Sequence, residues 1–123
     1  MNRSEIQTEL PLLALLPAPA KADGKTVRMC DTEQDAIAVS IRLSGLDQVV
    51  VAGRMGISET YLSLIKKGDR PLTEKLLPRF CTATGWDLVK QYRAMHSAMR
   101  MAEGYSREAD RLALIASYTR RAA

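Results

Sequence analysis

Apolar residues recur at helical spacing along most of this chain, and glycine or proline marks the breaks between the periodic segments. Between residues 46 and 68 the pattern divides into two short segments with Gly56 between them. The apolar faces of these segments are formed by Val51, Ala52 and Met55 in the first and by Leu62 and Ile65 in the second. Two short helices joined by a tight turn form a helix-turn-helix, which is the arrangement that we predict here.

The residues at the ends of the two segments agree with this prediction. Asp47 and Ser58 stand where a capping side chain accepts a hydrogen bond from a free backbone N–H. Gly56 stands where the turn requires a positive φ, and Gly68 stands where a cap residue ends the second helix. We therefore expect both helices to have defined ends.

The same stretch resembles the helix-turn-helix of the Cro/phage-repressor (XRE-type) family. The family pattern is Leu-Ser-Gln, an Ala four residues after that Gln, Gly-Val-Ser, two aliphatic residues and Glu-Arg-Gly. The residues that carry the resemblance are Leu46, Asp47, Gln48, Ala52, Gly56, Ile57, Ser58, Leu62, Ile65 and Gly68. The match extends from about Thr32 to Trp86, just under half of the chain. It implies an all-α, lambda-repressor-like domain of four to five helices that binds double-stranded DNA.

The resemblance also implies which residues contact DNA. In the family, outward residues near the start of the second helix enter the major groove, and the Gln that opens the first helix touches the DNA backbone. Carried over by position, the residues expected at base edges are Ser58, Glu59, Thr60, Ser63 and Leu64. Those expected at phosphates are Gln48, Tyr61, Lys66, Lys67 and Arg70. Leu64 has no polar group in its side chain, so a thymine methyl is its expected target. The alternative for Lys66, Lys67 and Arg70 is that they only form a solvated helix end and contact no phosphate.

Glu59 is the least expected residue of this set, because phosphates repel a carboxylate. The carboxylate offsets that repulsion only by accepting a hydrogen bond from a cytosine N4 amine. We therefore interpret Glu59 as a residue that selects C at one position of the site. The alternative is that Glu59 only stabilises the positive end of the helix dipole.

The regions on either side of the helix-turn-helix are predicted to differ in how well ordered they are. Residues 1–31 are expected to be a flexible N-terminal arm, because their prolines exclude a long helix and residues 18–25 look like a linker. The apolar run Leu10–Leu16 could anchor this arm on the body or on a partner. Residues 32–87 are expected to form the DNA-binding domain, and residues 88–123 a C-terminal helical extension.

Two further helices are expected within the domain. Thr32 is predicted to cap the first, with Ala36, Ile37, Val39, Ser40 and Leu43 along it and Gly45 at its end. Thr73 is predicted to cap the second, with Leu76, Leu77, Phe80 and Ala83 on its inner face and Gly85 at its end. Pro78 lacks an N–H, so we expect it to kink or shorten this helix.

The C-terminal extension is predicted to be a helical pair. Its first helix would carry a seam of Leu88, Tyr92, Met95, Met99 and Ala102, spaced four and three apart. Gly104 is expected to break it, and Ser106 to cap a last helix with Leu112, Ile115 and Tyr118. The pair either completes the core of the monomer or forms the interface of a homodimer. We favour the homodimer, because a dimer carries two DNA-binding helices, which match two half-sites that lie about one turn of DNA apart.

Charge and composition narrow the class of function. The net charge of +4 favours an anionic partner, but the basic surplus lies in residues 88–123 rather than in the helix-turn-helix. Cys30 and Cys81 stand far apart with no His or further Cys nearby, as is typical of reduced thiols in a cytoplasm. His96 is the only histidine, and no catalytic, cofactor-binding or metal-binding motif surrounds it. No apolar run approaches the length of a membrane span.

The sequence therefore predicts a cytoplasmic, sequence-specific DNA-binding transcriptional regulator that is not an enzyme. The simplest form is a homodimeric repressor of phage, plasmid or bacterial type that competes with polymerase for its site. Two alternatives remain open. One is an antitoxin-like regulator that also binds a partner protein through its N-terminal arm, and the other is an assembly or DNA-packaging subunit.

Overall fold

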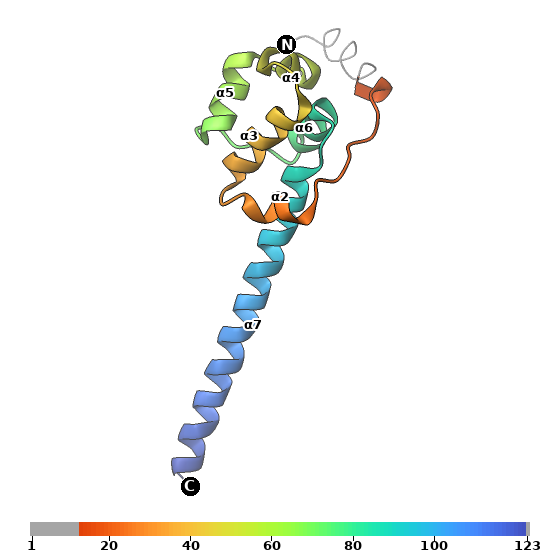
Figure 1. Cartoon of the computed structure of the whole chain (residues 1–123). Helices are drawn as coiled ribbons and strands as arrows, with labels where there is room; N and C mark the ends of the chain where they lie inside the picture. The colour runs from red at the N-terminus through yellow and green to blue at the C-terminus, as the bar shows by residue number, and fades with distance from the viewer. Residues whose placement is uncertain (1–12, 123) are drawn as a thin grey trace. The chain divides into compact units, whose positions relative to one another are not determined.

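The computed structural model describes residues 13–122, and their secondary structure is helical. Residues 13–15 are helical, and the helices that follow are α2 (Gly24–Met29), α3 (Glu33–Ser44), α4 (Gln48–Met55), α5 (Glu59–Lys67), α6 (Leu76–Thr84) and α7 (Leu88–Ala122) (Figure 1). These residues form no strand, and their only β-type pairing is an isolated bridge between Ala20 and Trp86. The predicted all-α class is confirmed. The chain divides into two units, Met1–Tyr92 and Arg93–Ala123.

The start of α3 follows the prediction. Thr32 Oγ1 accepts a hydrogen bond from the Asp35 N–H at 3.2 Å, and the Asp35 carboxylate accepts one from the Thr32 N–H at 3.2 Å. This reciprocal capping box satisfies two donors at the helix start. Along the helix Ile37 is buried as expected, but Leu43 is 44% exposed and Ile41 is buried in its place. Ile41 lies one turn beyond Ile37 and therefore continues the same inner face.

The turn between α4 and α5 has the expected geometry. The five residues predicted on the inner faces of these helices, Val51, Ala52, Met55, Leu62 and Ile65, are each at most 1% exposed. Gly56 has a φ of 77°, which only glycine adopts without strain. The Ile57 N–H donates to the Ala52 carbonyl at 3.1 Å and so ties the turn to α4. α4 packs against both α5 and α6.

Two helix starts differ from the prediction. The capping role given to Asp47 is wrong, because the Val50 N–H that such a cap needs donates to the Asp47 main-chain carbonyl at 3.0 Å. Thr73 Oγ1 does accept a hydrogen bond from the Leu76 N–H at 3.3 Å, but α6 begins only at Leu76. Pro78 therefore falls in the first turn of α6, where its missing N–H removes no helical hydrogen bond. The helix is shortened at its start rather than interrupted.

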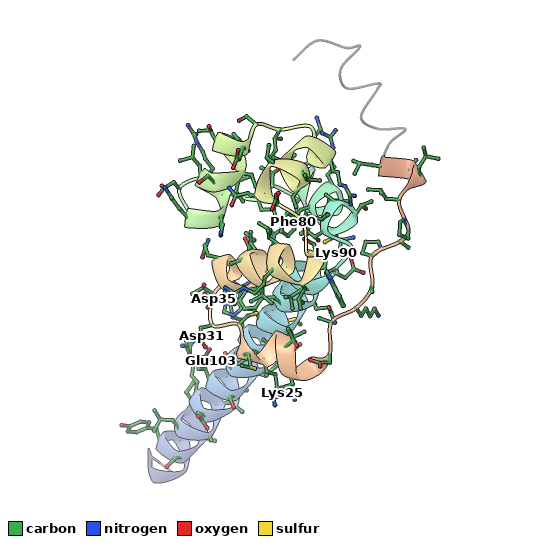
Figure 2. The ribbon with its side chains drawn as sticks, turned by 45° about the horizontal axis from the view of Figure 1, so that its top comes forward. Lys25, Asp31, Asp35, Phe80, Lys90 and Glu103 are labelled. Carbon is green, nitrogen blue, oxygen red and sulfur yellow. The ribbon has the colours of Figure 1, made fainter. Side chains whose placement is uncertain are left out.

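The centre of the N-terminal unit is Phe80, which is fully buried and points into the interior (Figure 2). Its neighbour Cys81 is also fully buried and is a free thiol. Burial, together with the Asp87 carboxylate nearby, raises the pKa of the Cys81 thiol to about 11. Burial raises the pKa of the Cys30 thiol as well. Both cysteines are therefore protonated near neutral pH, and they contribute to the core as small apolar side chains.

Residues 20–30 are built into the N-terminal unit, so the linker predicted for residues 18–25 is wrong over most of its length. The Asp23 carboxylate caps α2 by accepting a hydrogen bond from the Thr26 N–H at 2.7 Å. α2 is short, but Val27 and Cys30, spaced three apart, are each only 6% exposed. Burial of these two side chains holds a segment that has too few residues to be stable as a helix by itself.

Long-range hydrogen bonds fix the chain just before α2. The Ala20 N–H donates to the Gly85 carbonyl at 2.9 Å. The Gln91 side-chain amide bonds to both the N–H and the carbonyl of Ala22, each at 2.9 Å. Residues 1–12 lie outside the described residues, and so does part of the run Leu10–Leu16. Of that run, Leu15 is 82% exposed, so its side chain does not pack on the body.

The C-terminal helical pair is replaced by one helix, α7, of 35 residues. Its first residues Leu88, Val89 and Tyr92 are buried in the N-terminal unit, which extends to Tyr92. Gly104 does not interrupt α7, and its φ is not in the left-handed region. A glycine inside a helix costs about 1 kcal/mol relative to alanine. The flanking residues have high helix propensity and include no proline, so the helix continues through Gly104 despite this cost.

One glycine inside α4 and the glycine that ends it give a matched pair of predictions. Gly53 is inside the helix, and a Cβ placed there would meet no atom within 4 Å. Gly53→Ala should therefore raise the free energy of unfolding by about 1 kcal/mol. Gly56→Ala should lower it by about 1–2 kcal/mol, because φ is 77° there. Urea titrations of both variants measure the two effects, and a change of the same sign in both would contradict the geometry of the turn.

Candidate nucleic-acid interface

Local hydrogen bonds define both ends of α5. Ser58 Oγ accepts a hydrogen bond from the Tyr61 N–H at 3.1 Å, as the sequence predicts. Gly68 ends the helix with a φ of 88°, and its N–H donates to the Ile65 carbonyl at 3.1 Å. A Cβ at Gly68 would also lie 3.2 Å from the Gln34 side-chain amide. Because both ends are fixed, the side chains of α5 keep defined directions.

α5 has one buried and one accessible face. Leu62 and Ile65 are at most 1% exposed and hold the helix on the core. The residues predicted to read bases lie on the other side: Glu59 and Thr60 are exposed, and Ser63 and Leu64 are half-buried. The accessible face is therefore polar at the start of the helix and includes one aliphatic side chain further along.

An open hollow of about 240 Å³ lies between this face and the start of α4. Its lining consists of Gln48, Glu59, Thr60 and Ser63. These side chains offer an amide, a carboxylate and two hydroxyls, so the hollow presents both donors and acceptors of hydrogen bonds. The structure thus brings the predicted phosphate contact Gln48 beside three of the five predicted base contacts. Ser58 and Leu64 are not part of this lining.

The two remaining base-contact candidates have different constraints. The Ser58 oxygen already accepts the capping hydrogen bond, but its hydroxyl hydrogen can still donate. Leu64 uses its carbonyl to accept from the Asp69 N–H at 2.9 Å and from the Arg70 N–H at 3.3 Å. Its side chain is half-buried, which leaves part of it open to an apolar contact.

Three of the five predicted phosphate contacts lie at the other end of α5. Lys66 and Lys67 are exposed in its last turn, where the helix dipole favours positive charge, and Arg70 is exposed in the following loop. None of these three cations has an ion pair or side-chain hydrogen bond with another described residue. Tyr61 is half-buried. The cations are therefore available to an anionic partner.

A second hollow, of about 330 Å³, lies between α2 and α3 of the N-terminal unit. Its lining residues are Thr26, Met29, Cys30, Asp35, Ala38, Val39 and Arg42. This hollow was not predicted, because residues 18–25 were expected to be a linker and residues 1–31 a flexible arm. The signals that could have revealed α2 are the capping residue Asp23 and the spacing of Val27 and Cys30.

The described residues contain no group of three or more His, Cys, Asp or Glu side chains placed to hold a metal ion. Within the same residues, no single helix is both long and apolar enough to cross a membrane, and α3 and α4 meet the criterion only together, as a pair bent by 103°.

Comparison of the chain with models of known protein families, with curated proteins and with solved structures finds no match. The resemblance to the Cro/phage-repressor family therefore rests on the motif residues and their spacing. The geometry of α4 and α5 is an independent observation, because it follows from the fold of this chain.

Proposed function

We propose that this protein is a sequence-specific double-stranded DNA-binding protein of the helix-turn-helix type, with α5 as its recognition helix. One observation carries the proposal: the accessible face of α5 adjoins the start of α4 across a polar hollow, while its opposite face is fully buried. An α-helix with side chains is about 10–12 Å across, and the major groove of B-DNA is about 12 Å wide. A recognition helix needs such an accessible face on a rigid support.

The side chains of this face match the chemistry of base edges. The hydroxyls of Thr60 and Ser63 can donate to or accept from a base, and the Glu59 carboxylate can accept from a cytosine amine. Leu64 offers an aliphatic surface to a thymine methyl. Gln48 lies on the far side of the hollow, and its side-chain amide can donate to a phosphate of the groove wall.

The cations supply the part of the affinity that does not depend on sequence. Lys66, Lys67 and Arg70 are exposed next to the accessible face of α5 and can neutralise phosphates as the helix enters the groove. Glu59 and Asp69 oppose this attraction, so the local excess of positive charge is small. We expect weak binding to random DNA and a larger gain from the correct sequence.

We propose that the protein acts as a transcriptional regulator rather than as an enzyme, and that it functions as a homodimer. Occupying a site that polymerase needs is the simplest mechanism, and it makes the protein a repressor. This regulatory role is implied by the family resemblance, whereas the DNA-binding role is supported also by the geometry of α4 and α5.

The proposal predicts a specific role for Glu59. Selection of binding sites from random duplex DNA should give a preference for C at one half-site position, and Glu59→Ala should abolish that preference while keeping the others. The reason is that alanine removes the carboxylate that is proposed to accept from the cytosine amine, while the hydroxyls of Thr60 and Ser63 stay in place. Glu74→Ala, which removes an exposed carboxylate elsewhere, is the control and should leave all preferences unchanged. Equal base preferences in the wild type and Glu59→Ala would show that Glu59 reads no base.

A further inference from the structure

Residues 95–119 of α7 repeat a pattern every seven residues. Two adjacent columns along the helix are Met95, Ala102, Ala109 and Ala116, and then Ala98, Tyr105, Leu112 and Thr119. On the opposite side of the helix lie Arg93, Arg100 and Arg107, also seven apart. Apolar columns with a seven-residue repeat and a charged outer column are the pattern of a coiled coil.

Beyond Met95, which is half-buried, the two columns are exposed in the C-terminal unit. Tyr105 is 72% exposed, Leu112 is 57% exposed, and the adjacent Met99 is 60% exposed. The ion pair between Arg107 and Glu103, at 3.1 Å, belongs to the polar side of the helix. Most of the stability of a helix in a protein comes from packing of its apolar face, so a helix of this length requires a partner for that face.

We propose that this face of α7 pairs with the same face of a second copy in an antiparallel coiled coil. In an antiparallel pair the first column of one helix meets the second column of the other. Centred near residue 107, Ala102 then faces the partner's Leu112, and Ala109 faces the partner's Tyr105. In the same register Met95 faces the partner's Thr119, so each large side chain meets a smaller one, and only Ala98 and the partner's Ala116 bring two small side chains together.

A parallel pairing fits the same residues poorly. There each column meets itself, so alanines oppose alanines and leave a gap, while Tyr105 opposes the partner's Tyr105. Arg100 and Arg107 remain exposed in either arrangement. Glu108, at the edge of the antiparallel seam, would lie near the partner's Glu108, but this repulsion is exposed to solvent and screened by salt.

The pairing has a consequence for DNA binding that rests on the proposed function. By chain connectivity, the two N-terminal units join the paired segment at opposite ends, about 36 Å apart along it at 1.5 Å per residue. The length of α7, rather than a direct contact between the two recognition helices, then sets the spacing of the half-sites. The oligomer itself can be tested without DNA, so its failure would overturn the homodimer but leave the proposed reading of DNA by α5 intact.

The first test uses two leucines with nearly equal exposure. Leu112 is 57% exposed and lies on the seam, whereas Leu114 is 58% exposed and lies on the arginine side. Sedimentation equilibrium should show a dimer for the wild type and for Leu114→Glu, and a dissociation constant at least 100-fold higher for Leu112→Glu. A monomeric wild type at micromolar concentration, or equal weakening by both substitutions, would overturn the proposal.

The second test fixes the direction of the pair by cysteine cross-linking under mild oxidation. The double variant Ala102→Cys, Leu112→Cys should form a covalent dimer, and each single variant should not, because each residue faces the other and not its own copy. The native cysteines are buried, which protects them from cross-linking in the folded protein. Efficient cross-linking of Ala102→Cys alone would show a parallel pair and contradict the proposal.

Discussion

Replacing Thr60 by glutamate should lower the affinity of the protein for its selected DNA site by about 100-fold, equivalent to about 2.7 kcal/mol. Thr60 is exposed, and it is the second residue of α5. A carboxylate there is favourable for the helix, because the helix dipole is positive at this end. In the proposed complex, however, it would lie beside Glu59 in the groove and be repelled by the phosphates. The substitution thus separates binding from folding.

The matched control for Thr60→Glu is Ser97→Glu. Ser97 is exposed on α7, and its replacement changes the net charge by the same amount. Fluorescence anisotropy with a labelled duplex should show a loss of at most a few-fold for Ser97→Glu. Equal losses in the two variants would mean that only the total charge matters, and α5 would then not be the reading helix. Thermal unfolding of both variants checks that neither has lost its fold.

Replacing Phe80 by alanine should lower the free energy of unfolding by about 3–5 kcal/mol, the largest effect that we expect on stability. Phe80 is fully buried at the centre of the N-terminal unit, so the smaller side chain leaves a cavity that its neighbours fill only in part. Since domains are stable by only about 5–15 kcal/mol, this change is a large fraction of the total. The melting temperature should fall by roughly 15 °C or more.

Leu43→Ala provides the comparison for Phe80→Ala. Leu43 is an apolar residue of the same unit but is 44% exposed, so truncating it removes less buried surface. Its expected cost is about 1 kcal/mol or less. The free energy of unfolding of both variants can be measured by chemical denaturation, with one common slope of free energy against denaturant concentration. A cost for Phe80→Ala no greater than that for Leu43→Ala would contradict the burial of Phe80.

Sequence reasoning succeeded where the signal is local. The capping roles of Thr32 and Ser58 follow from the hydrogen bonds that these side chains make within one turn of their own helix. The positive φ of Gly56 and Gly68 follows from the steric freedom of glycine. The buried faces of α4 and α5 follow from helical periodicity. Each of these features depends on residues close together in the chain.

Sequence reasoning failed where contacts between residues far apart in the chain determine the local structure. Ala22 is held by the Gln91 side chain, and no local signal shows that these residues meet. α2 would not be stable alone, and burial of Val27 against the unit maintains it. Asp47 was misjudged because its main-chain carbonyl competes for the N–H that a cap requires. At Gly104 the general preference of glycine for helix ends was outweighed by the helix propensity of its neighbours.

The candidate site was predictable in part. Helical geometry alone placed Thr60 and Ser63 opposite Leu62, and the structure agrees. The hollow that joins Gln48 to α5 depends on how α4 and α5 cross, which periodicity does not specify. The assignment of these residues to bases and phosphates derives from the family resemblance and remains a prediction.

The central claim is that α5 reads a DNA sequence, and selection of sites from random duplex DNA tests it most directly. The salt concentration should be moderate, so that phosphate contacts alone do not retain DNA. We predict enrichment of one sequence, present as two inverted half-sites, with a spacing that gives the distance between the recognition helices of the homodimer. No enrichment, with binding that disappears as the salt concentration rises, would contradict the claim.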